Sequence, residues 1–184
     1  MRLFAAVVPP PDVLDHLASA LALAVPPGAG RAPWLPRDNW HLTVAFYGEV
    51  PGGAAAVLID DWPDGARGVP AFDMALSGAG TFHRSTAWIG AQADEKAWRA
   101  LARALAPSKL GVGRRDERAP RNRPHLTVAR GASEAVVAAM NALAVYRGPA
   151  WRAEEVVLFA SALGAGTGGH PRYDAQAVAP LRRP

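Results

Sequence analysis

Two copies of the pentapeptide His-Leu-Thr-Val-Ala carry the residues best suited to chemistry in this chain. They occupy His41–Ala45 and His125–Ala129, about half the chain apart. Side chains on a strand alternate between faces, so the histidine and threonine of each copy point one way. Leu42, Val44 and Phe46 point the other way in the first copy, toward a core. Two such strands facing each other would line one pocket with two imidazoles and two hydroxyls.

Such a pocket suits cleavage of a phosphodiester without a metal ion. An imidazole titrates near neutrality, so one ring can accept a proton from a nucleophile while the other donates a proton to the leaving oxygen. In-line displacement at phosphorus needs these groups on opposite sides, and hydroxyls can donate hydrogen bonds to the non-bridging oxygens. A metal site is the competing use of histidine, but no HxH, HExxH or acidic cluster accompanies these two. The sequence therefore predicts acid–base chemistry and no metal site.

The same order of elements surrounds both copies: a helix, the HLTV strand, a second helix and two strands. Apolar spacing, capping residues and Pro or Gly stops predict these elements. In the first half they are a helix from Pro11 to before Pro26, a strand over His41–Phe46, a helix over Ala54–Trp62 that ends at Pro63, and strands over Ala71–Ala79 and Ser85–Gly90. In the second half they are a helix capped by Asp94, a strand over His125–Ala129, a helix capped by Ser133, and strands over Val156–Phe159 and Tyr173–Val178. Leu3–Val8 reads as one more buried strand, and the duplication predicts two α+β lobes within a single unit.

Composition narrows the classes of protein further. The chain of 184 residues has no cysteine, which excludes disulfides, a thiolate nucleophile, iron–sulfur clusters and cysteine-based zinc sites. The net charge of +4 permits a polyanionic partner. Apolar runs are too short to span a membrane, and the N-terminus lacks the pattern of a signal peptide. We therefore expect a cytoplasmic protein without membrane association.

Arginines and aromatic residues near the second motif are candidates for contacts with a nucleic acid. The loop Gly111–Pro124 is either a solvated loop or an electrostatic guide for a nucleic-acid backbone, and it carries Arg114, Arg115, Arg118, Arg121 and Arg123. Strict alternation places Arg130 opposite His125, so Arg130 reaches a phosphate only where the strand ends or bulges. His83 lies in a turn that could edge the pocket. Aromatic residues that either stack on bases or belong to the core are Trp34, Trp40, Tyr47, Phe82 and Trp151.

Several segments together carry a family resemblance over nearly the whole chain. They are MRLFAAVVPP, WLPRDNWHLTVAFYGEV, FDMALSGAGTF, RPHLTVAR and VVLFASAL followed by Tyr173. The sequence resembles the bacterial and archaeal RNA 2′,3′-cyclic phosphodiesterases, also called 2′-5′ RNA ligases, of the two-histidine phosphoesterase superfamily. One departure is His83, which stands where the family often has proline. The resemblance implies one α+β domain over residues 1–184, made of two intertwined lobes related by a pseudo-two-fold axis. Two antiparallel sheets would face a central cleft, with the helices outside.

The resemblance also implies an activity and its residues. The activity is hydrolysis of RNA 2′,3′-cyclic phosphate ends to 2′-phosphates without a cofactor, with reversible 2′-5′ ligation as a related reaction. His41 would be the general acid and His125 the general base, although near symmetry allows the roles to be exchanged. Phosphate-binding residues would be Thr43, Thr127 and Arg130, and the substrate rim would hold Phe82, His83, Arg123 and Tyr173. The partner would be RNA, with no obligate protein partner. The alternative is an RNA-binding module with weak or absent phosphodiesterase activity.

Overall fold

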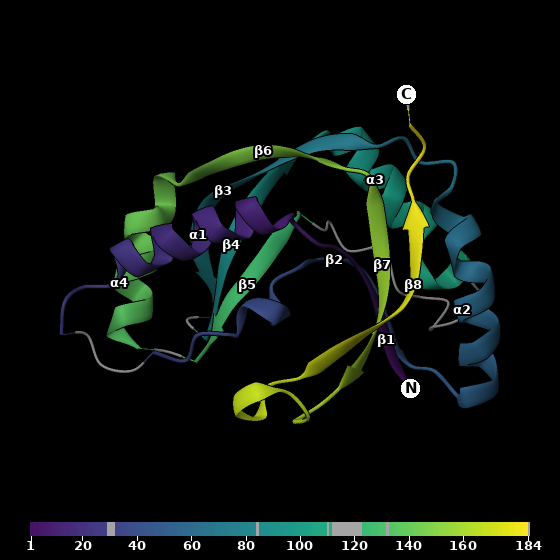
Figure 1. Ribbon diagram of the computed structural model, residues 1–184, viewed down its shortest axis with the longest axis horizontal. Coiled ribbons are helices and arrows are strands. Elements are labelled where there is room, and N and C mark those ends of the chain that lie inside the picture. Colours follow the sequence, from purple (N-terminus) through teal and green to yellow (C-terminus); the bar gives the residue numbers. More distant parts are fainter. Residues whose placement is uncertain (29–31, 84, 110, 112–122, 132, 184) are drawn as a thin grey trace.

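Eight strands and four α-helices make up the part of the chain that the computed structural model describes (Figure 1). The structure describes residues 1–28, 32–83, 85–109, 111, 123–131 and 133–183. In chain order the elements are β1 (Arg2–Val7), α1 (Pro11–Ala24), β2 (Leu42–Glu49), α2 (Gly52–Ala66), β3 (Phe72–Phe82), β4 (Thr86–Ala93), α3 (Glu95–Ala104), β5 (His125–Arg130), α4 (Glu134–Ala142), β6 (Arg147–Ala153), β7 (Glu155–Ala162) and β8 (Arg172–Pro180). None of the described helices is long and apolar enough to cross a membrane.

The strands form one curled antiparallel sheet with the order β6-β3-β4-β5-β2-β1-β7-β8. The two HLTV strands, β2 and β5, lie side by side at its centre. They are joined by a single register pair, Leu42 with Leu126. The expectation of two separate sheets is therefore corrected: the α+β class holds, but the two halves form one eight-stranded sheet. The reason is that β2 and β5 come close enough at their first residues to pair before they diverge.

Helices cover each half of the sheet, and each half takes helices from both parts of the chain. The helices α2 and α3 pack near β8, β7 and β2, whereas α1 and α4 lie against each other and against β6, β3 and β4 (Figure 1). Thus α1, the α-helix that precedes β2 in the chain, covers the half that contains β5. This crossing ties the two halves together around the central pair of strands.

The helix predicted to end at Pro63 instead continues to Ala66, so that prediction was wrong. Proline inside a helix destabilises it by about 3 kcal/mol or more. Trp62 compensates because it is fully buried and its Nε1 donates to Tyr47 Oη at 2.8 Å. Tyr47 Oη in turn donates to the carbonyl of Leu105 at 3.0 Å. Burial of such a side chain contributes about 1.5–3 kcal/mol and each hydrogen bond about 1 kcal/mol, which offsets the proline.

The edge strand β6 was not predicted, because its sequence contains Gly148 and Pro149, which usually interrupt strands. An edge strand can hold a proline since one of its sides has no partner strand, and β6 pairs only with β3. Gly148 also has a packing reason: a Cβ there would lie 2.9 Å from the Tyr146 hydroxyl. Tertiary pairing therefore overrides the local preference of this segment.

Both predicted helix caps are confirmed. The side chain of Asp94 accepts a hydrogen bond from the backbone N–H of Ala97 at 2.9 Å, at the start of α3. The hydroxyl of Ser133 accepts one from the N–H of Val136 at 3.2 Å, at the start of α4. These bonds fix where α3 begins after β4 and where α4 begins after β5.

Candidate active site

The two histidines lie at the centre of the sheet, at the point where β2 and β5 meet. His41 immediately precedes β2 and His125 is the first residue of β5, so each is next to the Leu42–Leu126 pair. The charges of Arg130 and of His125 both act on His41. The structure thus brings these three residues, from the two halves of the chain, to one place.

Both imidazoles are held by the same kind of hydrogen bond. Nδ1 of His125 lies 3.0 Å from the carbonyl oxygen of Arg123, two residues earlier. The ring of His41 bonds the backbone of Asn39, also two residues earlier, and this bond raises the pKa of His41. A backbone carbonyl oxygen can only accept a hydrogen bond, so in both cases the ring N–H is the donor. In His125 the donor is Nδ1, and Nε2 therefore carries the lone pair that is available for catalysis.

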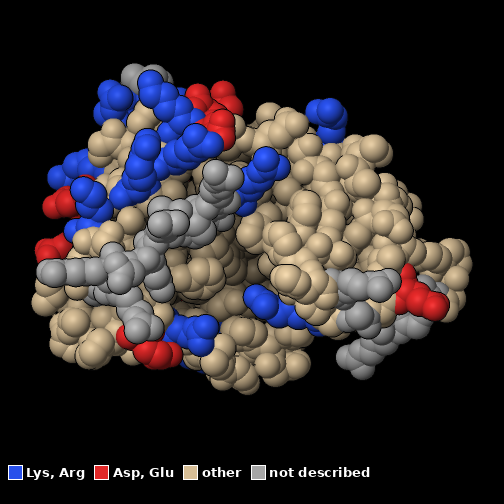
Figure 2. All heavy atoms as spheres, turned by 180° about the vertical axis from the view of Figure 1, so that it is seen from behind, with Lys and Arg blue, Asp and Glu red and all other residues tan. Residues whose placement is uncertain are grey.

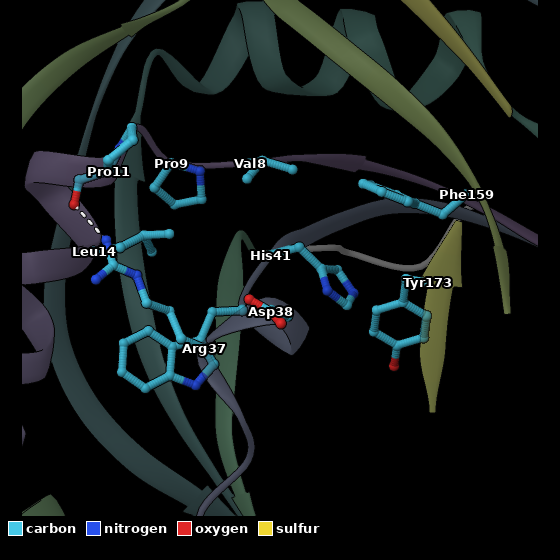
Figure 3. Close-up of a pocket in the computed structure, with 10 residues that line it drawn as sticks. Val8, Pro9, Pro11, Leu14, Arg37, Asp38, His41, Phe159 and Tyr173 are labelled. Carbon is cyan, nitrogen blue, oxygen red and sulfur yellow. Dashed lines mark hydrogen bonds between the residues drawn. The ribbon is translucent and has the colours of Figure 1, made fainter. Parts of the chain in front are cut away.

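Aromatic rings surround His41. Its ring centroid lies 4.8 Å from that of Phe4 and 5.2 Å from that of Tyr173, whose ring meets it edge-on at 88°. Phe159 lies 6.5 Å away, and Figure 3 shows the rings of His41 and Tyr173 beside each other below Phe159. Burial among these rings is the largest cause that lowers the pKa of His41 from 6.5 to about 4, and the charges of Arg130 and His125 contribute to the same shift. The imidazole of His41 is therefore neutral at pH 7 in the free protein.

His125 has a different aromatic neighbour. The ring of Phe82 on β3 meets it edge-on at 82°, with centroids 5.2 Å apart. Phe82 also packs against Trp88 on β4 at 5.4 Å and remains 44% exposed. A cavity of about 660 Å³ borders His125, Phe82 and Trp88. A second cavity of about 290 Å³ borders His41 and Tyr173 (Figure 3). Each histidine therefore opens onto a hollow of its own.

Thr43 and Thr127 follow their histidines by two positions, and both are half-buried. Positions two apart on a strand share a face. Each threonine therefore stands on the same face of its strand as the neighbouring imidazole.

A β-bulge follows each threonine at the same place in the two motifs. In β2, Ala6 is opposite Thr43 and Ala5 is opposite Ala45, so Val44 is an extra residue. In β5, Trp88 is opposite Thr127 and Ala87 is opposite Ala129, so Val128 is extra. A bulge shifts the alternation of side chains by one position. The strict alternation assumed from the sequence therefore does not extend past either valine.

Each bulge places the fifth residue after its histidine on the same side of the sheet as that histidine. These residues are Phe46 in β2 and Arg130 in β5. Past the bulge at Val128, Arg130 falls on the histidine side of the sheet, where it is exposed and its charge lowers the pKa of both His41 and Tyr173. Phe46 was expected in the core but is 61% exposed, with its ring 5.9 Å from that of Phe4. Sequence reasoning missed Phe46 because a bulge has no marker in a single sequence. The equal spacing of Phe46 and Arg130 from their histidines was the available signal.

The remaining predicted rim and stacking residues have varied positions. Arg123 is exposed and lines the larger cavity, whereas His83 is exposed in the β3–β4 turn with a φ of 47° and borders neither cavity described above. Three of the aromatic candidates, Trp40, Tyr47 and Trp151, are buried core residues.

Positive charge lies around a hollow on the face opposite to the view in Figure 1. Figure 2 shows Lys and Arg side chains near the edge of this hollow. Four arginines of the predicted basic loop, Arg114, Arg115, Arg118 and Arg121, lie outside the described residues. Among the residues that the structure describes, no three His, Asp or Glu side chains are close enough together to hold a metal ion.

A curled antiparallel sheet whose two central strands meet beside His41 and His125, with Thr43 and Thr127 two residues further along, defines an α+β protein of the two-histidine phosphoesterase class. The family model described as the 2'-5' RNA ligase superfamily matches residues 9–164. The chain belongs to this superfamily, which confirms the resemblance found in the motifs.

Named relatives and solved structures agree with this assignment. An RNA 2',3'-cyclic phosphodiesterase of Escherichia coli is 34% identical over 136 residues, covering 73% of this chain and 74% of that protein. One of Geobacillus stearothermophilus is 36% identical over 101 residues, which cover 53% of this chain but only 32% of that protein. The crystal structure of E. coli LigT complexed with 3'-AMP superposes with a TM-score of 0.72 at 28% identity, covering 98% of this chain and 96% of that one.

Proposed function

We propose that this protein is an RNA 2′,3′-cyclic phosphodiesterase that hydrolyses the cyclic end to a 2′-phosphate by two-histidine acid–base catalysis without a metal ion. The observation that carries the proposal is that His41 and His125 stand at the meeting point of β2 and β5, with Arg130 acting electrostatically on His41. The names of the curated relatives support the same activity.

The reaction assigns one proton transfer to each histidine. Nε2 of His125 accepts a proton from a water molecule as its oxygen attacks phosphorus. The bond from phosphorus to O3′ breaks on the opposite side, and the protonated ring of His41 donates its proton to O3′. The 2′ ester bond survives, so the product is a 2′-phosphomonoester with a free 3′ hydroxyl. Each transfer accounts for a rate factor of about 10²–10⁴.

The acid role of His41 requires that the substrate change its protonation. The pKa of about 4 keeps its ring neutral in the free protein. The negative charge of a bound phosphodiester favours the imidazolium and raises that pKa, because an opposite charge stabilises the charged form. The exchanged assignment, with neutral His41 as base and His125 as acid, needs no such change in His41, and the pH profile of a variant that lacks His125 separates the two.

The remaining side chains bind the phosphate and the nucleosides. Thr43 and Thr127 donate hydroxyl hydrogen bonds to the non-bridging oxygens, and the guanidinium of Arg130 binds them as a planar fork. Phe46 and Phe82 are exposed aromatic rings that offer stacking surfaces for bases. The rim is completed by His83, Arg123 and Tyr173.

We further infer that residues 1–184 act as one domain of two intertwined lobes with pseudo-two-fold symmetry and helices outside the cleft. One lobe is β6-β3-β4-β5 and the other is β8-β7-β1-β2, so β5 and β2 take equivalent inner places. The equivalent bulges in these strands support this relation. The chain has no cysteine, so neither its fold nor the proposed catalysis by imidazoles depends on an oxidising compartment. We infer a cytoplasmic enzyme that acts on RNA.

An oligonucleotide that ends in a 2′,3′-cyclic phosphate tests the proposal. We expect turnover in excess EDTA and a product that carries its phosphate on the 2′ oxygen. Loss of turnover on chelation would overturn the metal-independent mechanism, and a 3′-phosphate product would overturn the assigned leaving group. Binding of the oligonucleotide without turnover would support the alternative of an RNA-binding module. Supplying a second RNA with a 5′ hydroxyl tests for reversible 2′-5′ ligation.

A further inference from the structure

Asn39 is a buried polar residue for which the mechanism above has no use. It ends the 3-10 turn Arg37–Asn39 and lies two residues before His41. It is only 6% exposed, and within the described part of the chain it is the one polar or charged residue that is buried. Buried polar groups are retained where their hydrogen bonds are satisfied, so the partners of Asn39 indicate what it does.

Its partners come from both sides of the His41 pocket. The backbone of Asn39 bonds the ring of His41. Its side-chain Nδ2 donates to the carbonyl oxygen of Pro171 at 2.8 Å. The side chain also bonds Tyr173, and this bond lowers the pKa of Tyr173 against the larger effect of burial, which raises it. A hydrogen bond lowers the pKa of a tyrosine when the tyrosine oxygen accepts it, so the amide of Asn39 is the donor. The NH₂ group of Asn39 has two hydrogens, one for the carbonyl of Pro171 and one for the hydroxyl oxygen of Tyr173.

The second motif lacks this side-chain arrangement. Arg123 holds the position equivalent to Asn39, and its carbonyl oxygen likewise lies 3.0 Å from the ring of His125. The side chain of Arg123 is exposed. The backbone bond is therefore shared by both motifs, whereas the buried amide that ties two segments together belongs to the His41 side alone.

The segment that Asn39 holds depends on such an anchor. Four of the six residues from 164 to 169 are glycine, and three of these have positive φ angles. Glycine gives a chain more conformational freedom than any other residue. This segment leads into β8 and to Tyr173, whose ring meets that of His41 edge-on at 5.2 Å. The two bonds from Asn39 thus fix the start of β8 against the turn that precedes β2.

We propose that Asn39 is a positioning residue for His41: its side-chain amide fastens residues 171–173 to the turn before β2 and so holds the ring of Tyr173 against the imidazole. Its effect on turnover rests on the proposed function, but its effect on the imidazole does not. Without the amide, the Tyr173 ring separates from His41 and water reaches the pocket. His41 then loses both its orientation and its apolar surroundings.

The test compares Asn39→Ala and Asn39→Leu with Asn141→Ala, a matched control at an exposed asparagine of α4. Asn39→Leu keeps roughly the same volume without a donor or a charge, so it remains informative where Asn39→Ala fails to fold. Turnover is measured on the cyclic-phosphate oligonucleotide, and His41 is titrated by NMR without substrate. The groups that act electrostatically on His41, Arg130 and His125, are unchanged in every variant.

We expect kcat to fall by about 10–100-fold in both Asn39 variants, with KM changed less than threefold, because misplacing a catalytic group by about 1 Å has effects of this size. We also expect the titration midpoint of His41 to move up from about 4 toward the ordinary value of 6.5. The ring signals of His125 and the behaviour of Asn141→Ala should match the wild type.

Folded Asn39 variants with unchanged kcat and an unchanged His41 titration would overturn the proposal. Equal changes in the ring signals of both histidines would also overturn it, because they would show general loosening. If the wild type has no turnover but the His41 titration still moves in the variants, the proposed function fails and the positioning role stands. A lowered kcat with an unchanged titration of His41 would also overturn the proposal, because it would show that Asn39 affects turnover without acting on His41.

Discussion

Val44 and Val128 hold the same place in the two halves of the protein, each as the extra residue of a β-bulge. Each valine is the fourth residue of its HLTV motif. The bulge directs the histidine and threonine before it and the residue two positions after it to the same side of the sheet. One repeated irregularity therefore determines that Arg130 and Phe46 join the two histidines.

Removing either imidazole should abolish most of the activity. We expect His41→Ala and His125→Ala each to lower kcat by about 10²–10⁴-fold, since each removes one proton transfer. Both histidines are half-buried and hold only short-range hydrogen bonds, so the melting temperature should move by only a few degrees. His16→Ala, in an exposed histidine of α1, is the control and should retain full turnover. Wild-type turnover in either site variant would remove that histidine from the mechanism.

The pH dependence of activity should reveal the role of His41. The profile of kcat/KM reports the free protein, in which the pKa of His41 is about 4. In the wild type either assignment needs one ring protonated and the other neutral, so both give kcat/KM profiles of the same shape. In His125→Ala the residual activity depends on His41 alone of the two rings. Its kcat/KM falls as the pH rises through about 4 if His41 is the acid, and rises through that value if His41 is the base. Steady-state kinetics of this variant from pH 3.5 to 9 distinguish these signs, and the second pattern would exchange the two roles.

The stability of the protein should fall in mild acid because of His41. Its pKa is about 4 when folded and about 6.5 when unfolded, so between these values only the unfolded chain binds the proton. The free energy of unfolding is therefore unaffected above pH 6.5 and decreases as the pH falls from 6.5 to 4, by as much as about 3 kcal/mol. Urea unfolding at several pH values, compared with His41→Gln, isolates this contribution. Parallel curves for the two proteins would show that the folded state does not depress the pKa of His41.

Arg130 should matter as a fork of donors and not only as a charge. We expect Arg130→Ala to lower kcat by about 10²–10³-fold, the size typical of losing one donor to a developing anion. Arg130→Lys keeps the charge without the planar pair of donors, so it should recover only part of this loss. Arg99→Ala, on the exposed surface of α3, is the matched control. Full activity in Arg130→Ala would mean that the β5 bulge serves no phosphate contact.

Phe46 should contribute to binding of the substrate base. Stacking of a base on an aromatic side chain contributes about 1–3 kcal/mol, so Phe46→Ala should lower kcat/KM by roughly 5–150-fold. Phe46 is 61% exposed, and its loss should leave the melting temperature near that of the wild type. Val57→Ala, at an exposed apolar residue of α2, controls for surface apolar area. A substrate without a base at its end should be insensitive to Phe46→Ala, and equal losses on both substrates would contradict stacking.

Many features of this protein can be predicted from patterns of residues that are close together in the sequence. The paired HLTV motifs predicted which residues could do chemistry, and the capping residues Asp94 and Ser133 predicted where two helices begin. Local patterns failed where tertiary contacts outweighed them. Pro63 remains inside α2 because Trp62 is buried beside Tyr47, and β6 forms despite Pro149 because β3 supplies its partner.

The sequence alone determined the α+β class, the duplication and the two pairs of histidine and threonine, because alternation and capping act over a few residues. Only the tertiary structure decided that the two halves form one sheet, that bulges at Val44 and Val128 redirect their strands, and that His41 has a pKa of about 4. These features depend on desolvation and pairing by β1, β4, β7 and β8, segments distant in the chain. The motif sequence does not indicate which distant strands will pack against it. The two identical pentapeptides therefore acquire different electrostatic environments only when the chain folds.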